Sequence, residues 1–248
     1  RISRYGRKPR PSGRGGCHNG HLRKVINAVK AGSDLHPELP INLGGGGWKK
    51  QRPSPISMIW RWDWTGKPKT CLEALDALLN AGADPNMPDD LGRLGLALLL
   101  YIHGSKTPIE AMERLFEAKA DPLLASFTTQ GRSEANAMEL CVLGWMPNQA
   151  EAIVRVCPQA ATFTENPQDA PPLARLAANA NGWTEEGGLK MTRLLLEHGA
   201  SEDHRFIQQS PRALGWIAKA RAIMDEERLD KGLPAPDDAT PPRFSPRF

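Results

Sequence analysis

The stretch that decides the fold runs from residue 78 to residue 86 and reads Leu78-Leu79-Asn80-Ala81-Gly82-Ala83-Asp84-Pro85-Asn86. It starts at the end of an apolar helical pattern and passes into a glycine, the residue that most readily adopts the left-handed turn closing a helix. Asp, Pro and Asn follow, and each of these favours a turn. The segment therefore predicts a helix that ends near Ala81 and a chain reversal directly after it.

Apolar residues elsewhere recur with the spacing of short helices, and no run with a period of two predicts a strand of any length. Two further glycines, Gly32 and Gly199, follow such patterns and predict the same kind of helix end. The patterns are Leu22, Val25, Ile26 and Val29; Leu72, Leu75, Leu78 and Leu79; and Ile109, Met112, Leu115 and Phe116.

The chain also repeats itself. Five segments can be laid over one another, and their starts differ by 40, 42, 35 and 39 residues. A period of this size is typical of helix pairs that stack on their neighbours, because one pair cannot bury its apolar face alone. The segments are Ser54-Pro55-Ile56-Ser57-Met58-Ile59-Trp60, Leu94-Gly95-Leu96-Ala97-Leu98-Leu99-Leu100, Asn136-Ala137-Met138-Glu139-Leu140-Cys141-Val142, Pro171-Pro172-Leu173-Ala174-Arg175-Leu176-Ala177 and Ser210-Pro211-Arg212-Ala213-Leu214-Gly215-Trp216.

These segments resemble the ankyrin repeat family, whose first helix opens Thr-Pro-Leu-His-x-Ala and whose second helix ends Leu-Leu-x-x-Gly-Ala-Asp-x-Asn. Residues 78–86 match the second pattern throughout. Residues 195–201 match with Ser201 in place of Asp, and residues 116–122 match with Lys119 in place of Gly. The resemblance covers residues 21–232 and implies a protein that binds other macromolecules.

The fold class expected is all-α: an ankyrin-type solenoid of about five helix pairs with extended tails. Three parts are expected along the chain: a basic Arg/Gly/Pro-rich tail over residues 1–20, the repeat domain over 21–232, and a Pro-rich tail over 233–248. Residues 33–53 and 61–70 are expected to be loops outside the helical stack, because the repeat pattern resumes on either side of them.

Charge is divided unevenly along the chain. Residues 1–54 hold twelve Lys and Arg residues and two acidic ones, a net charge of +10, and the rest of the chain carries −6. An arm of this charge indicates a polyanion as its partner, and RNA is the one we expect, although a solubilising tail or the remnant of a targeting sequence has the same composition. The expected RNA-binding residues are Arg1, Arg4, Arg7, Lys8, Arg10 and Arg14.

A cluster of tryptophans lies in the predicted loop between two helices of one repeat. Trp and Arg dominate the energetics of protein interfaces, so the cluster is a candidate anchor for a protein partner. Large aromatic residues more commonly serve packing, and in that alternative Trp60 covers the repeat core while the others pack over an insertion. The candidate protein-binding residues are Trp60, Arg61, Trp62 and Trp64, with Trp183 and Trp48 in other predicted loops.

Residue patterns for catalysis or cofactor binding are missing from the sequence. Cys17, His18 and His21 lie close together, but a structural zinc site needs four ligands and no second pair has suitable spacing. Gly44 to Gly47 lacks the spacing of a phosphate-binding loop. We therefore expect no metal, no cofactor and no enzymatic activity.

Three further features of the sequence bear on the compartment of the protein and on membrane association. The four cysteines, Cys17, Cys71, Cys141 and Cys157, are widely separated and predict buried thiols. No apolar run is long enough to span a membrane. The chain starts at Arg1 rather than at a methionine, which favours a processed, imported protein and a mitochondrion over a chloroplast.

Four functions remain open at this point. The first is a non-catalytic scaffold subunit of a large assembly, an organellar ribosome above all, that binds protein subunits through its repeats and RNA through its arm. The second is a peripheral structural subunit of an organellar respiratory or photosynthetic membrane complex. A free-standing adaptor or inhibitor and an enzyme hidden in the insertions complete the list.

Overall fold

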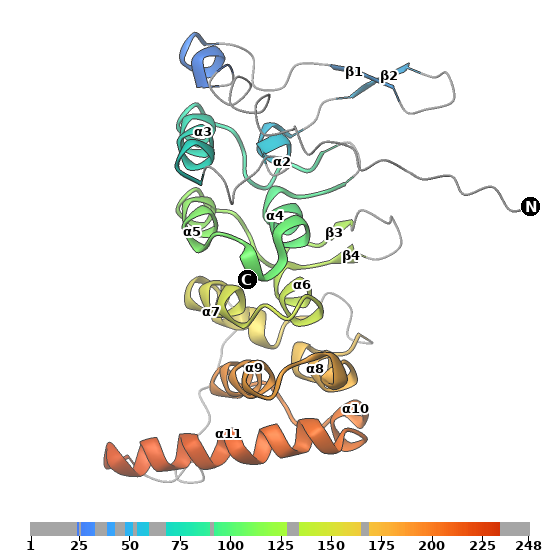
Figure 1. Ribbon diagram of the computed structural model, residues 1–248, viewed down its shortest axis with the longest axis vertical. Helices are drawn as coiled ribbons and strands as arrows, with labels where there is room; N and C mark the ends of the chain where they lie inside the picture. The colour runs from blue at the N-terminus through green and yellow to red at the C-terminus, as the bar shows by residue number, and fades with distance from the viewer. Residues whose placement is uncertain are drawn as a thin grey trace, which may run out of the picture. The chain divides into compact units, whose positions relative to one another are not determined.

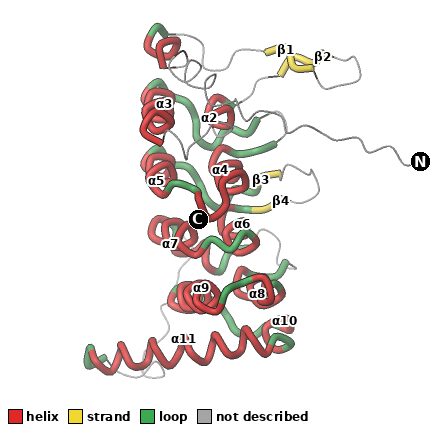
Figure 2. The backbone as a smooth tube through the Cα atoms, in the orientation of Figure 1, coloured by secondary structure: helices red, strands yellow, loops and turns green. Residues whose placement is uncertain are grey.

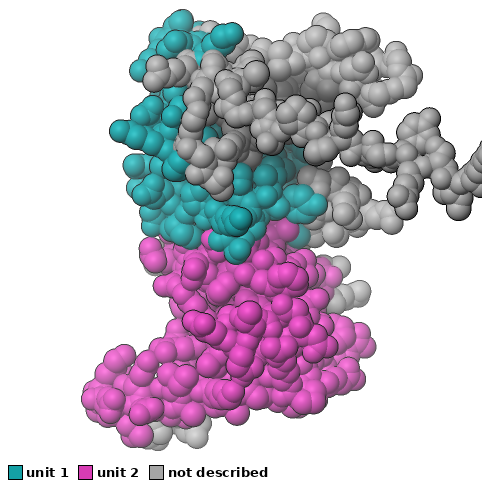
Figure 3. Space-filling model, viewed as in Figure 1, with its two compact units in different colours: residues 1–135 teal, residues 136–248 magenta. Residues whose placement is uncertain are grey.

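The computed structural model describes residues 24, 26–32, 39–42, 48–51, 54–59, 68–89, 92–127, 134–164 and 169–233. Helices account for most of these residues (Figure 1). The chain divides into two compact units, residues 1–135 and 136–248, which are coloured separately in Figure 3. The all-helical class predicted from the sequence is thus confirmed in its main feature.

Unit 1 contains two helix pairs and two short strand pairs. Helix α2 packs on α3 and on α4, and α3 also packs on α5 (Figure 1). The described elements are β1 (Leu39–Asn42), β2 (Trp48–Gln51), α2 (Pro55–Ile59), α3 (Pro68–Asn80), α4 (Gly95–His103), η1 (Gly104–Lys106), α5 (Ile109–Glu117), β3 (Ser126–Phe127) and β4 (Glu134–Ala135).

Unit 2 follows the same plan. The first helices α6 and α8 pack on each other, the second helices α7 and α9 do likewise, and α10 and α11 then pack on α8 and α9. The described elements are α6 (Ala137–Leu143), α7 (Pro147–Val156), η2 (Pro158–Ala161), α8 (Pro172–Ala178), η3 (Ala180–Gly182), α9 (Glu185–Glu197), α10 (Arg205–Gln208) and α11 (Pro211–Asp230).

The repeated segments fall where the pattern predicts helix starts. The five helices that carry them begin at Pro55, Gly95, Ala137, Pro172 and Pro211, each at the second residue of its segment. Local chemistry explains several of these starts, because a proline at the first helical position has no N–H left without a partner. Asn136 and Glu139 form a reciprocal capping box, and the Ser210 hydroxyl accepts a hydrogen bond from the Ala213 N–H.

The last segment does not form a first helix, which corrects the expected fifth pair. Helix α11 packs mainly on α9, which is a second helix, and the four-residue α10 packs on α8 instead. Figure 2 shows α11 lengthwise where α8 and α9 are seen nearly end on, so α11 crosses them. Ser210 and Pro211 specify that a helix starts, but they do not determine which layer it joins.

The turn after the second helix is the same at three places. Gly82, Lys119 and Gly199 have φ of +89°, +71° and +83°. In each case two N–H groups donate to carbonyls of the last helical turn, as when Gly82 N donates to Leu79 O at 3.0 Å and Ala83 N to Leu78 O at 3.0 Å. This arrangement gives partners to carbonyls that a helix end leaves open. The three predicted reversals at Gly32, Gly82 and Gly199 are confirmed, with φ of +75° at Gly32.

Polar residues after these turns explain why the pattern contains Asp and Asn. The Asp84 carboxylate accepts from the Asn86 N–H at 2.8 Å, and the Ser201 hydroxyl accepts from the Asp203 N–H at 3.1 Å. Serine therefore replaces aspartate without loss of the turn. The Asn86 side chain joins two repeats, since it donates to Lys119 O at 2.8 Å and accepts from Asp121 N at 2.8 Å.

We expect opposite effects from Gly82→Val and Lys119→Gly. Valine should lose more than about 1 kcal/mol of unfolding free energy, because a β-branched residue resists positive φ. A Cβ on Gly82 would meet no atom within 4 Å, so the loss would reflect the backbone alone. Glycine at Lys119 should gain about 0.5 to 1 kcal/mol. Urea unfolding measures both changes, and a Lys119→Gly variant less stable than wild type would contradict this explanation.

Two expectations about the insertions are wrong in part. Residues 33–53 contain an antiparallel strand pair, with Leu39 opposite Gln51 and Asn42 opposite Trp48. The expected loop over 61–70 is shorter than predicted, because α3 begins at Pro68 and residues 61–67 lie outside the described residues. A second strand pair joins Ser126 to Ala135. Pairing over two to four residues is too short to produce a visible period of two.

No helix in the described part of the chain is both long and apolar enough to cross a membrane, as the sequence predicted.

Candidate interaction site

Most of the residues predicted to bind partners cannot be placed. The six basic residues of the arm and four residues of the tryptophan cluster lie outside the described residues. So do Cys17, His18, His21 and Gly44 to Gly47. Those predictions stand as sequence predictions: Arg1, Arg4, Arg7, Lys8, Arg10 and Arg14 for RNA, and Trp60, Arg61, Trp62 and Trp64 for protein.

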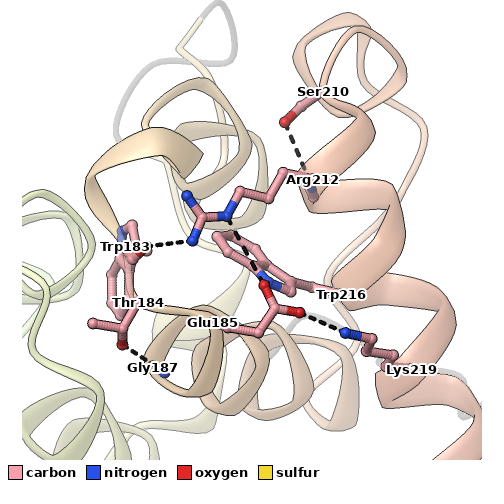
Figure 4. A network of polar contacts seen from close by, with 9 residues as sticks. Trp183, Thr184, Glu185, Gly187, Ser210, Arg212, Trp216 and Lys219 are labelled. Atoms are coloured by element: carbon pink, nitrogen blue, oxygen red, sulfur yellow. Dashed lines mark hydrogen bonds and ion pairs between the residues drawn. The ribbon is translucent and has the colours of Figure 1, made fainter.

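Two of the candidates, Trp48 and Trp183, lie in described residues. Trp48 was expected in a loop but begins strand β2, and Trp183 is not a surface residue. It lies in the predicted loop, between η3 and α9, but its side chain is only 3% exposed. The Arg212 guanidinium of α11 donates to the Trp183 carbonyl at 2.7 Å, as Figure 4 shows. The expectation that Trp183 contributes to an exposed protein-binding surface is therefore wrong, because this loop folds back onto the unit's core.

A second tryptophan organises the contact between α9 and α11. Trp216 is fully buried, and its indole N–H donates to the Glu185 carboxylate at 2.8 Å (Figure 4). Lys219, one turn further along α11, bonds the other oxygen of Glu185 at 2.6 Å. The Arg212 guanidinium lies 5.1 Å from the centre of the Trp216 ring, within range of a cation–π contact. These contacts hold the N-terminal end of α9 against α11.

The Glu185 carboxylate is held in its charged form by this arrangement. The hydrogen bond from Lys219 lowers its pKa, and the hydrogen bond from Trp216 lowers it further. A carboxyl whose pKa falls on folding stabilises the fold above its unfolded-state pKa, about 4.3 for Glu. That contribution is lost as the pH falls through the lower pKa of the folded state.

Two glycines in the first turns of α9 make room for the tryptophans. A Cβ on Gly188 would lie 2.4 Å from Cζ2 and 2.5 Å from Cη2 of Trp216. A Cβ on Gly187 would lie 3.3 Å from Cε3 of Trp183. Glycine inside a helix costs about 1 kcal/mol relative to alanine, so this pair is explained by close packing and not by helix propensity.

We expect Gly188→Ala and Gly215→Ala to change stability in opposite directions. Alanine at 188 should lose about 1 to 3 kcal/mol, since the buried Trp216 ring must move. Alanine at 215 in α11 should gain up to about 1 kcal/mol, because a Cβ there meets no atom within 4 Å. Urea unfolding of both variants gives the comparison. A gain in both would show that the ring has space beside Gly188.

An exposed tryptophan that the sequence did not single out lies in the turn between α6 and α7. Trp145 is 53% exposed, and Leu143 beside it is 46% exposed. The backbone of Trp145 has φ of +57°, which is an outlier for a bulky residue. Its ring lies against Gly182, where a Cβ would be only 2.7 Å from ring atom Cζ2. Strain of this kind gathers at functional sites, so Trp145 is the strongest candidate anchor in unit 2.

The repeated segments of the sequence contain a feature that points to Trp145. Trp62 follows the start of its segment by eight residues, and Trp145 follows its own by nine. In unit 1 the same region of α4 exposes Tyr101 at 43% and Ile102 at 41%. Apolar side chains at the end of the first helix thus recur in both units. The tryptophans of the Trp60 cluster lie at every second position from 60 to 64, whereas Trp145 stands alone in the sequence.

A groove of about 480 Å³ lies between α7 and α9 in unit 2. Its charges are paired across layers: Lys190 lies 2.9 Å from Glu151 of α7, and Arg193 lies 2.6 Å from Glu227 of α11. The groove therefore serves mainly to join three helices. Its lining residues are Glu151, Val154, Arg155, Lys190, Arg193, Leu194, Glu197 and His198.

The described cysteines are buried thiols outside any disulfide, as predicted. Cys71, Cys141 and Cys157 are all buried, and burial raises the pKa of the Cys141 thiol. A thiol that stays protonated is a poor nucleophile and a poor metal ligand. Among the residues that the structure describes, no three His, Cys, Asp or Glu side chains come together as a metal site.

Comparison with protein-family models and with curated protein sequences finds no match.

Proposed function

We propose that this chain is a non-catalytic, ankyrin-type scaffold that binds protein subunits within a large RNA-containing assembly. The observation that carries the proposal is the repeated helix pair with one recurring turn. In each unit, apolar side chains are exposed at the end of a first helix of such a pair. Stacked repeats of this kind offer extended surfaces for other proteins.

The side chains of the described residues favour a binding function over a catalytic one. The polar groups of unit 2 that lie closest together, such as Glu185, Lys219 and Arg212, bond one another and the helix layers. The exposed groups at Trp145 and Leu143 are apolar, as expected of an interface centre.

The assembly that fits best is an organellar ribosome, and a mitochondrial one in preference to a chloroplast one. The sequence of the arm supports this, since its arginines supply forked donors for phosphate and its glycines and prolines let an extended chain follow a groove. On this proposal the repeats bind protein neighbours and the arm binds RNA.

The substitution Trp145→Ala tests the proposal that the repeats bind protein neighbours. It should weaken binding of the full-length chain to the purified host particle by about 2 kcal/mol or more, as loss of an interface anchor does. The unfolding free energy should change much less, since the ring is half exposed. Val156→Ala, at an exposed apolar position at the end of α7, is the matched control.

Gly182→Ala adds a second measurement, because its Cβ would displace the Trp145 ring without removing it. Binding should again weaken. If Trp145→Ala unfolds the unit while the remaining folded fraction binds normally, Trp145 is a packing residue and the interface lies elsewhere.

A further inference from the structure

The outward face of α11 carries exposed leucines near both ends of the helix, with alanines and charged residues between them. The inward face holds Ala213, Trp216, Ile217 and Ala220, all buried against the rest of unit 2. The outward side chains include Leu229, 77% exposed, and Leu214, 38% exposed, with Leu233 at 55% just beyond the helix. A helix that ends a stack of repeats normally presents a polar outer face. Among the described residues of unit 2, this face of α11 thus stays exposed.

Charge is distributed along α11 in two halves. The part before Ala222 carries Arg212, Lys219 and Arg221 with no acidic residue, and the part after it carries four acidic residues and Arg228. A second α11 running antiparallel would place the basic half of each copy on the acidic half of the other. A parallel copy would place like charges together, which is unfavourable. The acidic residues are Asp225, Glu226, Glu227 and Asp230.

One register satisfies shape and charge together. With a two-fold axis beside Ala222, helical geometry places Leu229 over Gly215 of the second copy. A Cβ on Gly215 meets nothing within 4 Å, so there is open space for the leucine side chain. The same axis places Lys219 opposite Asp225, and it places Arg221 opposite Ile223, two residues from Asp225. Ala218 and Ala222 leave the two backbones free to approach closely.

We propose that two copies of this chain associate through antiparallel pairing of α11 around Ala222. The charged groups at its edges keep their partners within the chain: Lys219 lies 2.6 Å from Glu185, and Asp225 lies 3.4 Å from Arg228. Arg221 likewise bonds Glu202 at 2.6 Å. A carboxylate can accept several hydrogen bonds and an ammonium or guanidinium group can donate several, so these groups can also bond a partner on the facing copy.

The contact area between two α11 helices is small, so we expect weak association. A helix of 20 residues is roughly 30 Å long, and one helix face buries less than the roughly 800 Å² per partner of a typical stable complex. We therefore expect a micromolar, rapidly exchanging dimer. This inference is independent of the proposed scaffold function and of the basic arm.

Sedimentation velocity of the full-length, nuclease-treated chain up to about 100 µM tests the pairing. Wild type should show a concentration-dependent monomer–dimer equilibrium. Ala222→Glu should raise the dissociation constant at least tenfold, since it places two carboxylates at the axis. Ala178→Glu, at an exposed alanine ending α8, should leave the constant unchanged. A monomeric wild type, or equal constants for wild type and Ala222→Glu, would overturn the proposal.

Cysteine cross-linking tests the register in a Cys17→Ser background, where the described native cysteines are buried. A mixture of the Gly215→Cys and Leu229→Cys chains should form a disulfide-linked dimer under mild oxidation, well above the level of either chain alone. If Leu229→Cys links mainly to itself, the helices are parallel and the proposal is wrong.

Discussion

Trp216→Ala should destabilise the protein by about 3 to 5 kcal/mol, the largest loss of stability that we expect from one side chain. The Trp216 side chain is fully buried, lies against Gly188, and donates to Glu185 at 2.8 Å. Its removal leaves a cavity between α9 and α11 and removes the donor to the carboxylate. Urea unfolding followed by circular dichroism measures the loss.

Trp216→Phe is the matched control for that substitution. Phenylalanine keeps most of the ring and loses the indole N–H, so we expect a loss nearer to 1 or 2 kcal/mol. A loss below about 1 kcal/mol for Trp216→Ala would contradict the assignment of Trp216 as the residue that joins α11 to α9.

Deleting residues 1–20 should have the largest effect on binding. The arm contributes Arg1, Arg4, Arg7, Lys8, Arg10 and Arg14. Each can neutralise one phosphate, and six contacts correspond to a salt slope of about −4 for single-stranded RNA and about −5 if the target behaves like a duplex. We expect the truncated chain to bind RNA or the host particle at least about a hundredfold more weakly at low salt, with a much flatter slope.

The same deletion should barely change stability, because the arm shows no apolar pattern and the predicted repeat core begins near Leu22. Binding across a salt series and thermal unfolding are measured on the same two proteins. Equal affinities with parallel slopes would mean that the arm is a passive tail, and the RNA part of the proposed function would be wrong.

The helix starts and the turns could be predicted from the sequence because they depend on local chemistry. Gly82 was recognisable since a positive φ favours glycine, and Asn136 with Glu139 forms its cap within four residues. Lys119 shows that the surrounding repeat can impose the same turn, with φ of +71°, on a residue that disfavours it.

The features that could not be predicted from the sequence depend on contacts between residues far apart in the chain. Trp183 and Trp145 both lie in turns, yet Trp183 is 3% exposed and Trp145 is 53% exposed. Space beside Gly187 and the bond from Arg212, 29 residues away, hold Trp183 inside. The position of α11 on α9 likewise depends on Gly188 and Trp216, which lie on different helices. No local pattern contains that information.

Sedimentation of the native protein with and without nuclease tests most directly the proposal that this chain is a scaffold subunit held on RNA within a large assembly. The proposal predicts that the chain sediments with a large RNA-containing particle and is released when the RNA is digested or when salt is raised, as phosphate contacts require. Sedimentation as a free protein of 27.2 kDa would contradict it. So would retention in a nuclease-resistant membrane complex.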